Sequence, residues 1–261
     1  MKMKAFYITA AVIAAAVLVL AVVPARASKT DTRIESTAKS SYVFKTFLKD
    51  DAIKVKVKDG IATLTGTVAE SSHKSMAEET VAGLPGVTGV TNQLTVKGQP
   101  ASASSDAWVG EKVRTTLLFR RSVSYVNTKV SVENGKVTLR GEADSEAQKQ
   151  LTAEYAKDVS GVTEVDNQMT VAKTPAKPSR TTGEKIDDAS ITTQVRLTLL
   201  FHHGTDVFDT KVSTHKGVVT LSGTAKNQAE IDLATKRVVD INGVESVNNL
   251  MTIEAAQSST N

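Results

Sequence analysis

Residues 128–141 are TKVSVENGKVTLRG, and the pattern occurs twice more, as IKVKVKDGIATLTG at 53–66 and as TKVSTHKGVVTLSG at 210–223. Apolar and polar residues alternate on both sides of the central glycine, which is typical of half-buried strands. The dipeptides Asp59-Gly60 and Asn134-Gly135 favour a type I′ turn, because both residues of such a turn need a positive φ angle. Each stretch therefore predicts a β-hairpin that turns at its central glycine.

The hairpin belongs to a longer unit that occurs three times. Residues 31–97, 106–172 and 188–254, called units 1, 2 and 3 below, align without a gap, and thirteen aligned columns are identical in all three copies. A repeat of 67 residues is longer than a typical solenoid repeat and is near the lower size limit of a domain with its own core. We therefore expect three independent domains. The remaining segments are predicted to be a flexible linker at 98–105, a stiffer linker with Pro and Lys at 173–187 and a disordered tail at 255–261.

Each unit is predicted to fold as α-β-β-α-β, with two helices on one face of a three-stranded mixed sheet, so the fold class is α+β. Apolar or small residues at i, i+4 and i+8 before each hairpin predict the first helix. We expect the identical Asp31, Asp106 and Asp188 to be N-caps of this helix. Each core is expected to contain one of the identical phenylalanines, which are Phe44, Phe119 and Phe201.

A second helix is expected at about 70–84, 145–159 and 227–241, followed by the last strand. A glycine after each of these segments supplies the helix stop. The residues predicted to face inward on this helix are Met76 and Val81 in unit 1, Ala147 and Leu151 in unit 2, and Ala229, Leu233 and Val238 in unit 3.

Two further sets of identical residues have predicted structural roles. One glycine turns each hairpin and another closes its return strand, where we expect a bulge or a close backbone approach. The shared asparagine has the parity of buried residues, so its amide must be hydrogen-bonded, and we expect it to hold backbone near that second glycine. The predicted structural set is Gly60, Gly66, Asn92, Gly135, Gly141, Asn167, Gly217, Gly223 and Asn249.

The first 27 residues have the features of a Sec-type signal peptide. Lys2 and Lys4 precede an uncharged apolar run, and Ala25-Arg26-Ala27 is a small-x-small cleavage signature. We expect cleavage after Ala27 and a periplasmic location, with retention as a membrane anchor as the alternative. Because residues 1–27 hold three cationic side chains and no carboxylate, the net charge of +4 falls to +1 without them. The charge balance therefore does not indicate a nucleic-acid partner.

The residue inventory excludes several kinds of chemistry. With no cysteine there is no disulfide, no thiol nucleophile and no acylation site of a lipoprotein, and 4% aromatic residues argue against a base-stacking surface. No carboxylate pair recurs in the three copies, so we expect no catalytic acid and base, no metal and no cofactor. His202 and His203 are adjacent and are predicted to be solvated surface residues rather than metal ligands.

Two cationic features are candidate binding surfaces. The identical Lys54, Lys129 and Lys211 face outward on the first strand, where they either protect the sheet edge or contact an anion. The first helix of unit 2 starts with the single tryptophan, and a tryptophan beside cations suits an anionic lipid headgroup region. The alternative for this tryptophan is packing on its own core or on a neighbouring unit. The candidate lipid-binding residues are Trp108, Lys112, Arg114, Arg120 and Arg121.

The repeated pattern resembles the BON family, named for bacterial OsmY and nodulation domains. The motif is clearest in unit 2, where Gly135–Gly141 (GKVTLRG) is followed, after the second helix, by Gly161–Val171 (GVTEVDNQMTV). All three copies match, so the resemblance covers nearly the whole chain after the signal peptide. An export signal followed by tandem units is similar to the plan of OsmY-like members, although those typically carry two units and this chain has three.

The resemblance implies a function without catalysis. Members are thought to associate with phospholipid or envelope surfaces, or to act in osmotic or periplasmic stress and chaperoning. We therefore expect a periplasmic protein that binds anionic phospholipid peripherally. The alternative is a holdase chaperone for unfolded envelope proteins, which would need an exposed apolar surface.

Overall fold

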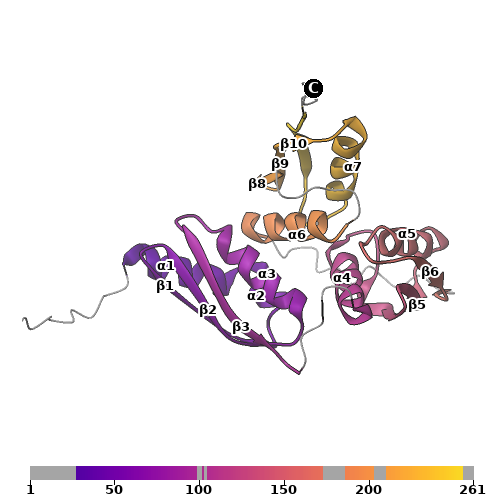
Figure 1. Cartoon of the computed structure of the whole chain (residues 1–261), viewed down its shortest axis with the longest axis horizontal. Coiled ribbons are helices and arrows are strands. Elements are labelled where there is room, and N and C mark those ends of the chain that lie inside the picture. The colour runs from indigo at the N-terminus through magenta and orange to yellow at the C-terminus, as the bar shows by residue number, and fades with distance from the viewer. Residues whose placement is uncertain (1–27, 99–101, 103–104, 173–185, 203–209, 255–261) are drawn as a thin grey trace, which may run out of the picture.

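The computed structural model describes residues 28–98, 102, 105–172, 186–202 and 210–254. The predicted signal peptide, most of each linker and the tail at 255–261 lie outside these residues. The described chain forms three units that meet at the helices α3, α4 and α6 (Figure 1). None of the helices in this part of the chain has the length and apolar character needed to cross a membrane.

Each unit has the predicted order of elements. Unit 1 consists of α1 (Lys29–Ser40), α2 (Tyr42–Thr46), β1 (Ala52–Lys58), β2 (Ile61–Val68), α3 (Ser71–Ala82) and β3 (Gly89–Val96). Unit 2 consists of α4 (Asp106–Phe119), a 3-10 turn (Tyr125–Asn127), β4 (Thr128–Glu133), β5 (Lys136–Ala143), α5 (Glu146–Lys157), β6 (Glu164–Asn167) and β7 (Thr170–Val171). Unit 3 consists of α6 (Asp188–Phe201), β8 (Lys211–His215), β9 (Val218–Ser222), β10 (Thr224–Ala225), α7 (Gln228–Val239), β11 (Ser246–Asn249) and β12 (Thr252–Ile253).

The sheet of each unit is mixed, as predicted. The hairpin strands pair antiparallel, with Val55 opposite Leu64, Val130 opposite Leu139 and Val212 opposite Leu221. The last strand returns through the second helix and pairs parallel to the second strand of the hairpin. Parallel pairing requires such a crossover, so the α+β prediction and the α-β-β-α-β order are confirmed.

The shared aspartate joins the first helix to the hairpin turn. In unit 2 the Asp106 carboxylate accepts hydrogen bonds from the backbone N–H groups of Asn134, at 2.6 Å, and of Gly135, at 2.9 Å. Asp31 and Asp188 accept the equivalent bonds in the other units, and the bond from Gly60 lowers the pKa of Asp31. The predicted N-cap role was wrong, because the residues that cap the helices are Ser28, Ser105 and Asp187.

The shared asparagine joins the second helix to the last strand. Asn167 donates to the carbonyl oxygen of Lys149 in α5 at 2.8 Å, and its side-chain oxygen accepts from the N–H of Met169 at 3.2 Å. Asn92 and Asn249 make the equivalent bonds. The amide of this residue is thus hydrogen-bonded both to the backbone of the second helix and to that of the last strand.

The glycine that closes the hairpin lies very close to the backbone of another segment. Gly141 has φ +126°, and a Cβ atom at this position would lie 1.8 Å from the carbonyl oxygen of Asn127. Any side chain would therefore clash with the backbone of the 3-10 turn that precedes the opposite strand.

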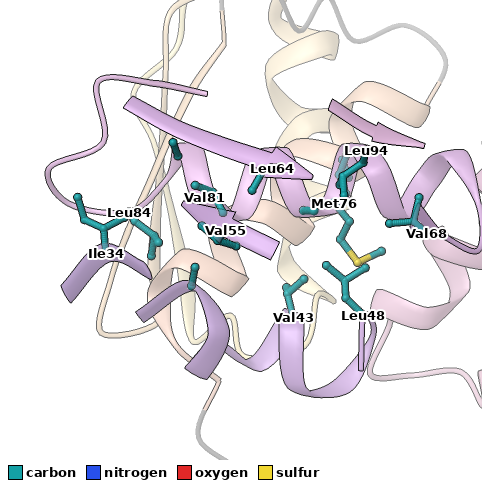
Figure 2. Close-up of a cluster of buried hydrophobic side chains, with 14 of the residues drawn as sticks. Ile34, Val43, Leu48, Val55, Leu64, Val68, Met76, Val81, Leu84 and Leu94 are labelled. Carbon is teal, nitrogen blue, oxygen red and sulfur yellow. The ribbon is translucent and has the colours of Figure 1, made fainter. Parts of the chain in front are cut away.

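Each unit has a small aliphatic core between its helices and its sheet. Figure 2 shows the core of unit 1, in which Val55 and Leu64 of the sheet face Ile34, Val43 and Met76 of the helices. The cores of units 2 and 3 are built in the same way.

The inward face of the second helix was predicted correctly only in part. Met76, Val81 and Val238 are buried, but Ala147 and Ala229 are exposed and Leu151 is 39% exposed. The helix α3 of unit 1 is the equivalent of α5, and its side that matches the position of Ala147 is covered by the helices α4 and α6 of the other units. The helix α5 has no such cover. The difference therefore arises from packing between units.

Replacing the shared aspartate should destabilise a unit. We expect Asp106→Ala to lower the free energy of unfolding by about 2 kcal/mol, because two N–H groups of the hairpin turn lose their acceptor. Urea unfolding followed by circular dichroism measures this change. Asp166→Ala, which removes a carboxylate from the open face of the same sheet, is the matched control, and an equal loss in both variants would contradict the assigned role.

Candidate functional site

An apolar junction between the units contains most of the aromatic side chains of the described residues. Phe119 at the end of α4 and Phe201 at the end of α6 are fully buried, and both belong to the apolar cluster of unit 1. Phe119 packs 5.5 Å from Phe47, and Trp108 packs edge-to-face on Phe201 at 5.6 Å. The prediction that Phe119 and Phe201 fill the cores of their own units was therefore wrong, and the three units pack on one another through these side chains.

The helix α3 of unit 1 lies across α4 and α6. Near its start, Glu70 pairs with Arg114 of α4 at 3.0 Å, and near its end, Glu79 pairs with Arg196 of α6 at 3.1 Å. The two arginines occupy the same position in units 2 and 3. One helix of unit 1 is thus held at both ends by equivalent residues of the other two units.

Unit 1 differs from the other units where its first helix breaks at Ser41. The backbone N–H of Tyr42 donates to the Asp187 carboxylate at 2.7 Å, and that of Val43 donates to the Ser190 hydroxyl at 3.1 Å. These bonds dock the break onto the start of α6. In units 2 and 3 the first helix runs unbroken to its phenylalanine.

A group of charged residues lies between units 2 and 3. Arg237 of α7 makes two bonds of 2.7 Å to the Asp158 carboxylate, with 4% of the Arg237 side chain exposed. Arg120 is 2% exposed, stacks 4.3 Å from the centre of the Tyr155 ring and donates to the carbonyl oxygen of Arg237. Burial lowers the pKa of Arg120 and raises that of Tyr155.

The other half of this interface is centred on Asp240. The Tyr155 hydroxyl donates to the Asp240 carboxylate at 2.7 Å, and Arg121 lies 3.4 Å from it. Arg121 also donates to the carbonyl oxygens of Val239 and Val244. A cation at the end of a helix such as α7 satisfies carbonyl groups that have no partner inside the helix.

His202 is buried in the same interface. Its side chain has no exposed surface, and Nε2 lies 3.4 Å from Arg120 Nη2 and 3.9 Å from the Asp158 carboxylate. Burial, assisted by the charge of Arg120, lowers the pKa of His202 to about 3. The prediction of a solvated His202 was therefore wrong, and His203 lies outside the described residues.

Lys112 lies in a surface hollow of about 630 Å³ between the start of α4 and the turns at Gly135 and Gly161. It is 8% exposed and donates to the carbonyl oxygen of Ser160. Burial lowers its pKa.

The five candidate lipid-binding residues therefore all make contacts inside the protein. Trp108, Arg114, Arg120 and Arg121 contact units 1 or 3, and Lys112 contacts its own unit. A lipid role for this set stays a prediction, and most of the set would have to leave these contacts to fulfil it. Tyr155, Asp158, Arg237 and Asp240, which complete the interface, were not predicted, since they do not recur in all three copies.

The open face of the sheet of unit 1 carries a group of exposed cations. Lys54, Lys56 and Lys58 of β1 are exposed, and they lie opposite Thr65, Thr63 and Ile61 of β2. Lys54 and Lys58 form no ion pair within 4.0 Å with any described residue, and the 79% exposed Lys56 approaches Glu35 at 3.6 Å. We call these three residues the lysine face.

The equivalent faces of the other units lack this charge. In unit 2, Lys136 pairs with Glu164 at 2.9 Å and Arg140 bonds to Gln168. In unit 3 the first strand has one lysine, Lys211. Over the described residues, no three His, Asp or Glu side chains come together as a potential metal site.

Comparison with known proteins identifies the repeated unit. The model of the BON domain family matches residues 30–98, 105–173 and 187–255. The chain is 33% identical to osmotically-inducible protein Y of Escherichia coli over 144 residues, which are 55% of this chain and 70% of that protein. It is 34% identical to the outer membrane lipoprotein DolP of Haemophilus influenzae over 109 residues, which are 41% of this chain and 56% of DolP.

Similarity to solved structures is weak. The C-terminal domain of CdsD, a type III secretion protein of Chlamydia trachomatis, aligns with 88% of this chain and 100% of its own length, at 16% identity and a TM-score of 0.23. A likeness at this level says nothing about the function of the chain.

The buried ion pair should stabilise the interface of units 2 and 3 more than an exposed pair does. A double-mutant cycle of Arg237→Ala and Asp158→Ala should give a coupling energy of about 1–3 kcal/mol, and urea unfolding measures it. The matched control is the exposed pair of Lys136 and Glu164, for which we expect about 0.2–1 kcal/mol. Equal coupling in the two cycles would contradict a special role of the interface.

The single tryptophan should report on the junction. Because Trp108 packs on Phe201, we expect Phe201→Ala to admit water to the indole and to shift its fluorescence emission to longer wavelength. Phe44→Ala, which alters the equivalent residue of unit 1, is the comparison. An unchanged emission in Phe201→Ala would show that Trp108 does not depend on this contact.

Proposed function

The chain belongs to the BON domain family, and on this premise we propose that it is a non-catalytic protein of the bacterial envelope that binds anionic phospholipid surfaces through the lysine face of unit 1. The observation that carries this proposal is the exposed row of Lys54, Lys56 and Lys58, which projects from a sheet face that no helix of the described residues covers. A lysine near an anionic membrane contributes about 1 kcal/mol to binding. Three such residues on one strand suit a flat surface of phosphate groups.

The neighbouring residues support a flat anionic partner. The strand β2 contributes Thr63 and Thr65 to the same face, and β3 contributes Thr91 and Gln93. None of these side chains carries a charge, and the carboxylate that approaches the lysine face is Glu35, 3.6 Å from Lys56. On unit 2, by contrast, carboxylates and cations alternate on the same face, which suits water better than an anionic surface.

The predicted export signal and the relatives support a place in the envelope. One relative is named as an outer membrane lipoprotein. This chain has no cysteine to carry a lipid, so a peripheral contact would have to come from protein side chains. Periplasmic location, membrane association and osmotic stress remain parts of the proposal.

The helix α4 is a second, conditional contact. To reach a membrane, Trp108 and Arg114 would have to leave their contacts with units 3 and 1, and the 40% exposed Arg121 would have to leave its bonds to unit 3. The lysine face needs no such opening, and for this reason we favour it as the first contact.

Replacing the lysine face should weaken binding to anionic vesicles. For the chain without residues 1–27, we expect Lys54→Ser, Lys56→Ser and Lys58→Ser together to reduce affinity for phosphatidylglycerol vesicles by about 3 kcal/mol, roughly a hundredfold. Co-sedimentation measures this, and binding of the parent should fall as salt rises, because salt screens exposed charges.

The matched control replaces Lys39, Lys157 and Lys236, which are exposed on helices, by serine, so that the net charge changes equally. Equal losses in the two triple variants would show that only total charge matters. Equal binding of anionic and zwitterionic vesicles would exclude the proposed ligand. If the chain suppresses the aggregation of a client protein, and if added lipid does not change this suppression, the holdase alternative would be favoured instead.

A further inference from the structure

Units 2 and 3 face each other across an approximate two-fold axis. The N–H of Asn242 donates to the carbonyl oxygen of Phe119 at 2.9 Å, and the N–H of Ser160 donates to that of Phe201 at 2.8 Å. Each bond is the counterpart of the other, because the two units are related by a shift of 82 residues. The isolated bridges between Arg120 and Ile241 and between His202 and Val159 are related in the same way. This reciprocity is the mark of an isologous interface.

The side chains at the centre of the interface break this symmetry. Arg120 of unit 2 occupies the position of His202 in unit 3, and the two side chains meet, with 3.4 Å between Arg120 Nη2 and His202 Nε2. If two copies of unit 2 paired in this way, two guanidinium groups would meet instead. Like charges in a buried interface oppose association.

We infer that the interface of units 2 and 3 is a selective docking surface, on which Arg120 accepts an unlike unit that presents a neutral imidazole at the position of His202. Selection therefore has two parts. An arginine opposite Arg120 is rejected, and a protonated histidine is rejected for the same reason.

The orientation of the imidazole supports this inference. His202 Nδ1 contacts the carbonyl oxygen of Thr198, so Nδ1 carries the hydrogen, and the lone pair of Nε2 faces the N–H of Arg120. Protonation of Nε2 would direct a positive N–H at the guanidinium. A neutral acceptor is the form that fits.

The carboxylate nearest to His202 does not remove this conflict. Asp158 lies 3.9 Å from Nε2, but Arg237 already holds both of its oxygens at 2.7 Å. The remaining ionisable groups of the interface are Tyr155, Asp240 and Arg121, which bond to one another. Two arginines thus face the imidazole and one shared carboxylate opposes them, in agreement with its lowered pKa of about 3.

The sign of the pH effect follows from this lowered pKa. A histidine exposed by opening has a pKa near 6.5, so docking is at full strength above that value and is lost progressively as the pH falls towards 3. At pH 5.5, one unit below the pKa of the open state, the docking equilibrium should be about tenfold weaker than at pH 7.5.

Hydrogen exchange in the full chain tests the inference even when units 2 and 3 separate only rarely. The N–H groups of Asn242 and Ser160 are protected by the interface, whereas those in the centres of the sheets are protected by each unit's own fold. After correction for the intrinsic exchange rate, we expect protection of these two amides to fall about tenfold from pH 7.5 to pH 5.5. Protection in the sheets should not change in this way.

Three variants identify the residue responsible. His202→Gln keeps an acceptor without a titrating group and should abolish the pH effect, while the matched control His215→Gln, an exposed histidine of the same unit, should retain it. His202→Arg should remove protection of Asn242 and Ser160 at pH 7.5. If the sheet of unit 3 also loses protection in His202→Arg, the substitution has disturbed the fold of that unit. The pH dependence of protection in His202→Gln then tests the inference. A pH effect absent from the parent, or retained in His202→Gln, would overturn the inference.

Discussion

The hydrogen bonds between a shared aspartate and the hairpin turn are the constraint on which the rest of this structure depends. They fix the start of each first helix against the far end of its hairpin, so the helix must run back across the sheet. Its C-terminal end then projects beyond the unit with a phenylalanine, as α4 does with Phe119 and α6 with Phe201. A small domain with a limited core thereby gains an additional apolar surface for packing on a neighbour.

Three units with one fold thus form an assembly in which each has a different place. Units 2 and 3 keep unbroken first helices and pair reciprocally, whereas in unit 1 the helix breaks at Ser41 and docks on the start of α6. The helix α3 contacts both unit 2 and unit 3 near the approximate two-fold axis that relates them. The pair of units 2 and 3 therefore accommodates a single copy of unit 1. The match between Glu70 and Arg114 at one end and Glu79 and Arg196 at the other specifies this position.

The fold of the units could be predicted because its determinants are local and recur. Alternation, the turn dipeptides and the identical Gly141 and Asn167 each constrain neighbouring backbone, and three copies support one interpretation. The interface could not be predicted in this way, because its contacts join positions at which the copies differ, such as Arg120 with His202 and Arg237 with Asp158. Trp108 beside cations has the composition of a lipid-facing surface, and no local pattern indicates that another unit covers it.

The contacts between the units explain which cations are exposed, and the net charge of the chain does not. Arg120, Arg121 and Arg237 are held between units 2 and 3, where Asp158 and Asp240 oppose them. Arg120 and Arg237 are buried, so their paired charges contribute little to the field outside the protein, whereas 40% of the Arg121 side chain is exposed. Lys54, Lys56 and Lys58 are by contrast exposed on a strand at the sheet edge, opposite the uncharged Thr65, Thr63 and Ile61. The strand β1 thus presents three exposed lysines on one face, whereas the three arginines are held in contacts between units 2 and 3.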